Sequence, residues 1–307
     1  MVAGVLPGDL ACGCLSTLIP EEPEPAPAPP PAAVPAEAAP PPVEEAPPEG
    51  FFFDLPNDPI RPANITLQPG QLDEFPGGLR ALAGDDTVIG SSSDELMNGN
   101  AGNDVLFGRG GDDTLRGGQG NDALYGEEGD DILNGNRGDD LVVGGRGNDF
   151  LRGGQDNDLL IGGQGNDTLI GDFGQNRLVG GTGTNLFILR PETGTATPDE
   201  ADMILDFNND RIGLANGLRL NDITFQEGYV RNFETELTIM QSYTSDPILV
   251  LAELSPEQLD PNGNGLLEGT LIRQVSTDRV LAFVLNATPT DLFTAMEVVP
   301  PEIMAIG

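Results

Sequence analysis

The feature that most constrains this chain is a tandem array between residues 81 and 188, which divides without a gap into twelve units of nine residues. A representative unit is GGQGNDTLI, residues 162–170, and its neighbours include GGQGNDALY at 117–125 and GNAGNDVLF at 99–107. A short fixed period is typical of a solenoid, in which each unit packs only on its neighbours. The array therefore has to be interpreted before the rest of the chain.

Three positions of the unit carry the expected fold. Position 1 is Gly in eleven units, position 4 is Gly in ten, failing at Ser93 and Asp156, and position 8 is apolar in all twelve. Glycine, with Asn or Asp beside it, supplies the positive-φ conformations that a tight turn requires. We expect positions 7 to 9 to form a very short strand whose middle side chain points inward. Two units then make one coil, and six coils stack into two parallel sheets.

Position 6 forms an acidic column. It is Asp in nine units, and the exceptions are Glu95, Asn176 and Asn185. The nine are Asp86, Asp104, Asp113, Asp122, Asp131, Asp140, Asp149, Asp158 and Asp167. Carboxylates stacked about 5 Å apart along one edge repel by about 3 kcal/mol at an effective dielectric near 20. A divalent hard cation between adjacent turns reverses this sign, and Ca²⁺ accepts carboxylate and carbonyl oxygens in a more flexible geometry than Mg²⁺ does.

This unit resembles the nonapeptide of the repeat-in-toxin (RTX) family, GGxGxDxUx with U apolar. The resemblance implies an all-β fold, a right-handed parallel β-roll, that binds Ca²⁺ between neighbouring turns through the position-6 Asp and the main-chain carbonyls of positions 1 to 5. The glycines implied as carbonyl ligands are Gly99, Gly102, Gly108, Gly111, Gly117, Gly120, Gly126, Gly129, Gly135, Gly138, Gly144, Gly147, Gly162 and Gly165. Six turns on each edge leave five gaps, so we expect at most ten ions. Glu95, Asn176 and Asn185 depart from the pattern at the ends of the columns.

The charge balance also favours an inorganic cation as partner. The formal net charge is -36, every one of the 14 cations is Arg, and His is absent. This balance argues against nucleic acid and anionic membrane surfaces. The lack of His and Lys excludes a His general base, a His metal ligand and a Lys Schiff base. Only Cys12 and Cys14 are present, and we expect this pair to be inert.

The regions before the array predict a linker and a cap. Residues 20–50 consist almost only of Pro, Ala, Val and Glu, so we expect residues 1–50 to form a disordered, extended segment. The alternative is a ligand for a proline-recognising module. Residues 51–80 predict an irregular N-terminal cap. The chain has no run of 18 apolar residues, and its start lacks the basic region and continuous apolar core of a secretory signal.

The region after the array, residues 189–307, predicts a small β-rich domain. Residues 203–220 resemble the segment that closes the end of RTX rolls, and two β-hairpins are expected at 236–259 and 270–292. Between them, residues 260–271 match the start of an EF-hand loop but carry Leu271 at the position of the bidentate Glu. An Asn-Gly turn and a calcium loop both remain open there, and the turn is favoured.

Position 9, which points outward, differs between the two sheets. On one it reads Ile89, Phe107, Tyr125, Val143, Ile161 and Val179, and on the other Asn98, Arg116, Asn134, Arg152, Ile170 and Ile188. We expect only the first face to be apolar, and such a patch is larger than a monomer usually exposes. The leading hypothesis is that residues of the same chain outside the roll cover it, and the alternative is a partner, including a second copy.

These observations favour a non-enzymatic, calcium-binding protein of the RTX type that is secreted or displayed at the cell surface and folds when it meets extracellular Ca²⁺. The resemblance implies export through a type I ABC exporter with an uncleaved C-terminal signal. Neither HExxH nor GxSxG occurs, which argues against an RTX protease or lipase. A calcium-dependent module that recognises a cell-surface polysaccharide or a protein remains the alternative.

Overall fold

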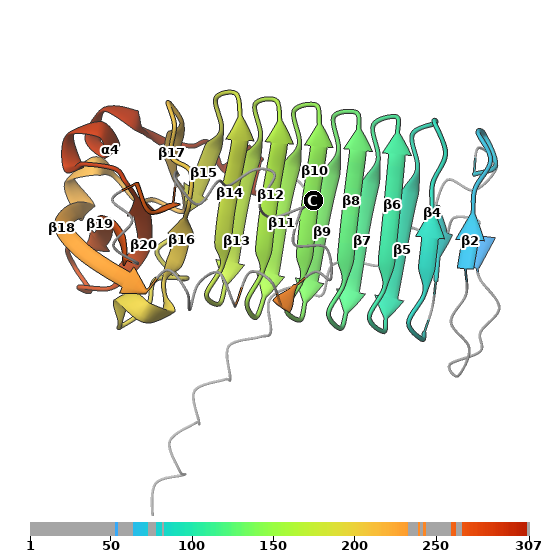
Figure 1. Cartoon of the computed structure of the whole chain (residues 1–307), viewed down its shortest axis with the longest axis horizontal. Coiled ribbons are helices and arrows are strands. Elements are labelled where there is room, and N and C mark those ends of the chain that lie inside the picture. The colour runs from blue at the N-terminus through green and yellow to red at the C-terminus, as the bar shows by residue number, and fades with distance from the viewer. Residues whose placement is uncertain are drawn as a thin grey trace, which may run out of the picture. The chain divides into compact units, whose positions relative to one another are not determined.

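The computed structural model describes residues 53–54, 64–72, 78–81, 83–232, 239, 242–243, 259–261 and 266–305. Their strands form two sheets that face each other across the core (Figure 1). Sheet A contains, in spatial order, β1 (Phe53–Asp54), β3 (Leu79–Arg80), β5 (Leu96–Ala101), β7 (Thr114–Gln119), β9 (Ile132–Arg137), β11 (Phe150–Gln155), β13 (Thr168–Phe173), β15 (Leu186–Leu189), β17 (Arg211–Leu214) and β21 (Met296–Val298). Sheet B contains β2 (Asn64–Thr66), β4 (Thr87–Ile89), β6 (Val105–Gly110), β8 (Ala123–Glu128), β10 (Leu141–Arg146), β12 (Leu159–Gln164), β14 (Arg177–Thr182), β16 (Asp202–Ile204), β20 (Val280–Leu285), β19 (Leu266–Gln274) and β18 (Ile223–Asn232).

The parallel solenoid predicted from the period is confirmed. From β4 to β13, each strand of the array pairs with the strand eighteen residues later, as in the successive registers Leu106↔Leu124 and Val142↔Leu124 on sheet B. The twelve apolar side chains of position 8 are completely buried and form one continuous core cluster. Alternation of the chain between the sheets therefore brings one inward side chain from every unit into a single narrow core.

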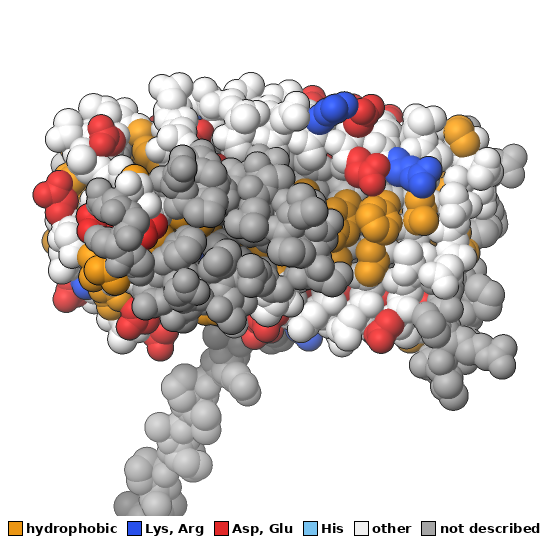
Figure 2. Space-filling view, viewed as in Figure 1, with side chains coloured by type: hydrophobic (Ala, Val, Ile, Leu, Met, Phe, Trp, Pro, Cys, Tyr) orange, Lys and Arg blue, Asp and Glu red, His pale blue; other side chains and the backbone are white. Residues whose placement is uncertain are grey.

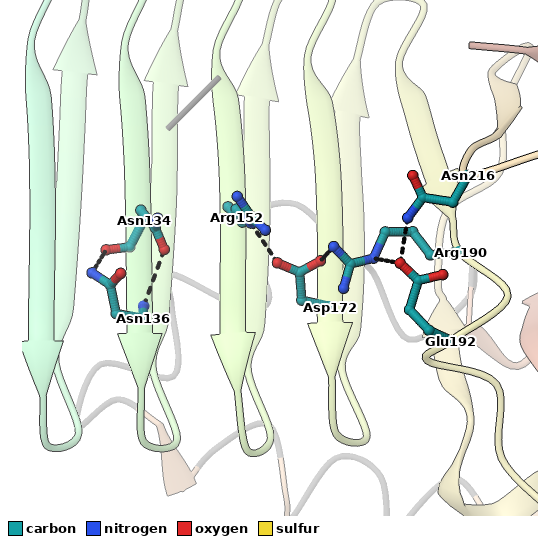
Figure 3. Close-up of polar contacts among 7 residues, drawn as sticks. All are labelled: Asn134, Asn136, Arg152, Asp172, Arg190, Glu192 and Asn216. Carbon is teal, nitrogen blue, oxygen red and sulfur yellow. Dashed lines mark hydrogen bonds and ion pairs between the residues drawn. The ribbon is translucent and has the colours of Figure 1, made fainter. Parts of the chain in front are cut away.

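The strands are longer than the predicted three residues. Most strands of the array have six, running from position 7 of one unit to position 3 of the next. Position 2 has a positive φ, for example 75° at Asn136, which bends the strand without ending its pairing. The backbone N–H of Asn136 donates to Oδ1 of Asn134 at 3.1 Å and stabilises this bend (Figure 3). The pairing between strands skips position 1 and resumes at positions 2 and 3. Side-chain alternation alone could not predict this interruption.

Both sheets continue beyond the array. At the N-terminal end β2 pairs with β4, and β3 pairs with β5 and β1. At the C-terminal end β16 pairs with β14, and β17 pairs with β15. Residues 203–220, predicted to close the end of the roll, instead continue it, because β16 pairs further with β20 (Val280–Leu285) and β17 with β21.

The β-rich C-terminal region is also confirmed. Strands β18, β19 and β20 are antiparallel, and β20 joins sheet B through a parallel pairing with β16. The hairpin expected at 270–292 corresponds to β19 and β20. The short helices are η1 (Pro198–Glu200), η2 (Leu220–Asp222), α4 (Pro289–Ala295) and η3 (Pro301–Ala305). In the stretch proposed as a calcium loop, Glu268 and Leu271 lie in β19 and Leu271 is buried, so these two positions do not adopt the loop geometry of an EF-hand.

The apolar outer face of sheet B is partly covered by residues of the same chain. Leu159, Ile161 and Val179 are buried in a cluster that also contains Leu259 and Phe283 from the C-terminal region. Nearer the N-terminal end, Phe107 and Tyr125 stack with ring centroids 4.9 Å apart and stay partly exposed. Figure 2 shows hydrophobic side chains gathered on this face over the region of β6 and β8. The leading hypothesis therefore holds for the C-terminal half of the face.

The expectation that only one sheet is apolar outside is wrong. On sheet A, a second cluster buries Phe150, Ile170, Leu186 and Ile188 together with Val299. Position 7 contributes Phe150 and Leu186 to this cluster, so the outer surface cannot be judged from position 9 alone.

A row of charged side chains on sheet A ties the roll to the segment that follows it (Figure 3). Asp172 forms ion pairs with Arg152 and, at 2.8 Å, with Arg190, whose guanidinium also lies 3.4 Å from Glu192. Asn216 donates to the same Glu192 carboxylate. Asp172 and Arg190 are buried, so this pairing is less screened by solvent than an ion pair at the surface.

Several predictions fall on residues that are not described. These are the linker at 1–50 with Cys12 and Cys14, and most of the hairpin at 236–259. Among the described residues, no helix is long and apolar enough to span a membrane.

Candidate metal centre

The position-6 carboxylates lie where each turn enters a strand. All nine are at most 3% exposed, although each is charged at neutral pH in an unfolded chain. Alternate units place them on opposite edges of the roll, as predicted. Asp86, Asp104, Asp122, Asp140 and Asp158 precede strands of sheet B, whereas Asp113, Asp131, Asp149 and Asp167 precede strands of sheet A.

From Asp104 onward, one oxygen of each carboxylate holds two turns together. Oδ1 accepts the backbone N–H of the position-6 residue in the preceding turn, eighteen residues earlier. Asp104 donates in this way to Asp122 at 2.7 Å, and Asp122 donates to Asp140 at 2.7 Å. The same bond recurs on the other edge, where Asp113 donates to Asp131 at 2.7 Å. Each of these carboxylates therefore crosses the gap between two turns.

The second oxygen has no hydrogen-bond partner among the residues that the structure describes. Oδ2 of the eight aspartates from Asp104 to Asp167 is buried and accepts no hydrogen bond. Leaving a buried acceptor unsatisfied costs about 1–3 kcal/mol, and more when the group is charged. Eight such atoms in two regular rows, each in an equivalent place, indicate a missing positive charge rather than eight independent packing defects.

The position-1 glycine makes room beside this second oxygen. None of the position-1 glycines has a positive φ, so the tight turn does not explain them. A Cβ on Gly99 would overlap Oδ2 of Asp104 and would lie 2.7 Å from the carbonyl oxygen of Gly117 in the next turn. The space that a side chain would fill is thus bordered by a carboxylate oxygen and a main-chain carbonyl oxygen, which are the ligand types that Ca²⁺ accepts.

Glycine is required at position 4 because of the backbone conformation of the turn. Gly102 has φ 139°, and a Cβ there would overlap the carbonyl oxygen of Gly84 in the preceding turn. Asp156 replaces this glycine in one unit and adopts φ 79°, a conformation that Asp tolerates better than most residues. Asp158 of the same unit keeps its place, since its Oδ1 accepts the N–H of Asp140 at 2.9 Å.

The predicted carbonyl ligands therefore follow the two columns. The position-1 members are Gly99, Gly108, Gly117, Gly126, Gly135, Gly144 and Gly162, and the position-4 members are Gly102, Gly111, Gly120, Gly129, Gly138, Gly147 and Gly165. Among the described residues, no group of three or more His, Cys, Asp or Glu side chains is arranged to hold a metal ion. A bound cation must consequently draw most of its ligands from the main chain, and the role of each glycine as a ligand stays a prediction.

The ends of the columns are filled by side chains whose oxygens have protein partners. Glu95 accepts hydrogen bonds from the hydroxyl of Ser91 and, at 2.9 Å, from its backbone N–H. At the other end, Nδ2 of Asn176 donates to Oδ1 of Asp202 at 2.8 Å, and the N–H of Asn185 donates to Asp210 at 2.7 Å.

Sequence reasoning missed Asp202 and Asp210 as the last members of the two columns. They lie 26 and 25 residues after Asn176 and Asn185, so a search with a step of eighteen does not find them. Asp206 was missed too, and its carboxylate accepts the N–H groups of Gly180 and Gly181 at 2.7 and 2.6 Å. The sequence signal that could have revealed them is that residues 202–210, just after the array, begin and end with Asp.

A second ladder runs along each edge through position 5. Its exposed side chains accept the N–H of the following turn, opposite in direction to position 6. Asn121 donates to Asn103 at 2.8 Å, and Asn148 donates to Asp130 at 2.7 Å. This ladder explains why position 5 is mostly Asn or Asp, and it does not depend on charge.

Burial raises the pKa of the position-6 carboxylates. The pKa rises to about 6 for Asp104 and Asp131, about 7 for Asp122 and Asp167, and about 8 for Asp113, Asp140 and Asp149, and it is raised well above 3.8 for Asp158. Desolvation is the main cause, and neighbouring carboxylates add to it, while the backbone hydrogen bond opposes it. Without a cation, the columns therefore favour protons as a substitute.

Comparison with known families agrees with this geometry. The model of the RTX calcium-binding nonapeptide repeat (4 copies) matches residues 79–106, 89–124, 107–142, 116–151 and 152–187. A search of the curated proteins found no match. Residues 79–187 thus consist of RTX calcium-binding nonapeptide repeats, which support a calcium-binding β-roll protein.

Proposed function

We propose that the roll is a calcium-dependent folding unit of a non-enzymatic extracellular protein, and that Ca²⁺ between its turns completes the two acidic columns. The observation that carries this proposal is the set of buried Oδ2 atoms without a partner, eight in all from Asp104 to Asp167. Binding energy that exists only in the folded state appears as folding energy. The ion and the fold are therefore expected to form together.

The position-6 carboxylates and the carbonyl oxygens of the turn would hold each ion. Gly99, Asp104 and Gly117 border one such space on the sheet B edge. A bound ion would supply a positive charge that offsets the burial of two carboxylates. Position 6 contains no Arg that could supply this charge instead. The protein's own contribution is to hold Oδ1 by a backbone hydrogen bond, so that Oδ2 stays directed into the space beside the glycine.

An extracellular, structural role fits the remaining features. RTX repeat proteins are generally extracellular. The absence of His and Lys removes the side chains that most acid–base and Schiff-base mechanisms use, which supports a non-catalytic role. The apolar strip at Phe107 and Tyr125 supports attachment to a partner or a second copy as part of that role.

The test is far-UV circular dichroism of the full chain during a calcium titration at pH 7.5, with magnesium as the control ion. We expect β-structure to appear with calcium and not with equal concentrations of magnesium. Equilibrium dialysis then counts the bound ions, for which we predict at most ten. A roll that is already complete in chelator contradicts the proposal.

Two adjacent aspartates offer a matched pair of variants. Asp131→Asn removes a buried position-6 carboxylate, whereas Asp130→Asn removes an exposed position-5 carboxylate whose Oδ1 contact an amide can replace. We expect the calcium midpoint to rise by about 10- to 150-fold for Asp131→Asn, since one charged ligand is worth about 1.5–3 kcal/mol, and to change little for Asp130→Asn. Equal effects of the two variants would contradict the assignment of position 6 as the ligand.

A further inference from the structure

A surface cavity of about 550 Å³ lies beside the sheet B edge of the roll. Its floor is formed by the position-5 side chains of four successive turns on that edge, Asn121, Asp139, Asn157 and Gln175. Its far wall is formed by residues from the region after the array, including Tyr243. This volume lies within the range of sites that hold small molecules.

The far wall is attached to the roll by a direct hydrogen bond. The hydroxyl of Tyr243 donates to the backbone carbonyl oxygen of Asn157 at 2.7 Å. Ser242 stabilises the local turn by donating from Oγ to the carbonyl oxygen of Ile239 at 2.6 Å. Among the described residues, this bond joins the far wall of the cavity to the roll.

The lining is rich in planar polar groups. Asp139 accepts the N–H of Asn157 at 2.8 Å through Oδ1, and the exposed carboxylate borders the cavity. Arg177 is only 1% exposed and donates to the carbonyl oxygen of Gln175 at 3.3 Å. The amide and carboxylate groups together offer both donors and acceptors to a ligand. The ring of Tyr243 adds a smaller apolar surface.

The charges narrow the class of ligand. Asp139 supplies the exposed charge among the described lining residues, because Asp122 is 3% exposed and belongs to a calcium column and Arg177 is 1% exposed, and the whole chain has a net charge of -36. A phosphate or a polyanion is repelled by this balance. The lining also offers amide groups that both donate and accept, and a simple cation would leave the donors unused. A neutral ligand with many hydroxyl groups fits best, because each hydroxyl both donates and accepts.

We propose that this cavity is a binding site for a neutral saccharide, of the size of a mono- or disaccharide. The Asp139 carboxylate and the Asn121 amide bind its hydroxyl groups, and the Tyr243 ring contacts its C–H surface. The inference rests on the proposed calcium-dependent folding, since the floor exists only when four turns are stacked. Saccharide binding is therefore calcium-dependent although the ligand does not contact the ion.

The experiment uses the full chain in calcium and saturation-transfer difference NMR with glucose, galactose, mannose, N-acetylglucosamine, cellobiose, maltose and lactose. We expect transfer to at least one of these sugars in calcium and to none in chelator. Inorganic phosphate is the competing probe. Circular dichroism on the same samples reports whether the roll is folded.

Asp139→Asn and Asp130→Asn form the control pair. Both residues occupy position 5, and each accepts the N–H and Nδ2 groups of the Asn in the next turn, at 2.8 and 3.3 Å for Asp139 and at 2.7 and 3.2 Å for Asp130. Only Asp139 borders the cavity. We expect the dissociation constant of the sugar to rise about tenfold in Asp139→Asn and to stay unchanged in Asp130→Asn.

The outcomes separate this proposal from the preceding one. No transfer to any sugar while the roll is folded overturns the saccharide site, as does an equal loss in both variants or displacement of the sugar by phosphate. A roll that is already folded in chelator contradicts calcium-dependent folding. Sugar binding that is lost only in Asp139→Asn supports the cavity even then.

Discussion

The middle of the roll and its C-terminal end share one turn geometry, but the buried side chain at position 6 has different partners in the two regions. In the middle, Asp104 to Asp167 keep one oxygen buried without a partner. At the end, the amide of Asn176 takes the equivalent place and donates to Asp202. Under the proposed function the middle needs a cation, whereas the end closes the column on the sheet B edge with a hydrogen bond. A single solenoid would then combine a metal-dependent stretch with a metal-independent one.

Removing calcium is expected to separate these two regions most strongly. In chelator, backbone amides of residues 99–170 should lose all protection, because the unpaired carboxylates no longer have an opposing charge. Amides of residues 202–214 and 266–285 should retain protection, since their contacts are hydrogen bonds and apolar burial. Hydrogen exchange followed by mass spectrometry measures both regions at once. Equal loss of protection would show that the end has no stability of its own.

Acidification should affect the middle in the opposite way from calcium removal. The folded pKa of Asp113, Asp140 and Asp149 is about 8, above the unfolded value near 4. Protonation thus stabilises the metal-free fold, and this contribution is complete below pH 4 and is lost as the pH rises to about 8. In chelator, β-structure measured by circular dichroism should increase from pH 8 to pH 4.

In calcium the sign reverses, because protons compete with the ion for the same carboxylates. The calcium midpoint should rise by about tenfold or more between pH 8 and pH 5.5. A calcium midpoint that does not depend on pH would mean that the buried carboxylates are not the ligands.

Asn176→Asp should convert the end into a copy of the middle. It replaces the Nδ2 donor to Asp202 by a second buried carboxylate, so we expect a loss of about 1–3 kcal/mol in chelator. Calcium should recover much of this loss by occupying the new gap. Urea unfolding with and without calcium measures both effects. Asn166→Asp is the control, since it makes the same change at an exposed position-5 residue, and it should alter neither value by more than about 0.5 kcal/mol.

Much of the fold followed from the period of nine. Position 8 had to point inward in every unit, and the burial of all twelve side chains from Val88 to Phe187 agrees with this. The columns also followed, because units n and n+2 share an edge. The sequence did not reveal that the two glycine positions serve different purposes. Glycine at position 1 makes room for a carboxylate, whereas glycine at position 4 allows the turn to adopt a positive φ.

Features that join the array to other segments were harder to predict. Asp202 and Asp210 continue the columns at spacings that the period does not contain. Val299 covers Ile170 and Ile188, although more than one hundred residues separate it from them. The cavity at Asp139 likewise depends on where Tyr243 lies. Contacts between distant segments are set by three-dimensional packing, which local spacing does not encode.

The alternation of the two edges determines how such a roll can change in length. Deleting one nonapeptide would transfer every later unit to the opposite sheet. Outward residues of sheet A, such as Arg152, would then take the places of outward residues of sheet B, such as Ile161, which packs in one cluster with Leu259. Deleting eighteen residues keeps every later unit on its sheet and only shortens the stack. Nonapeptides should therefore be gained and lost in pairs during evolution, so that the unit of insertion or deletion is the eighteen-residue coil.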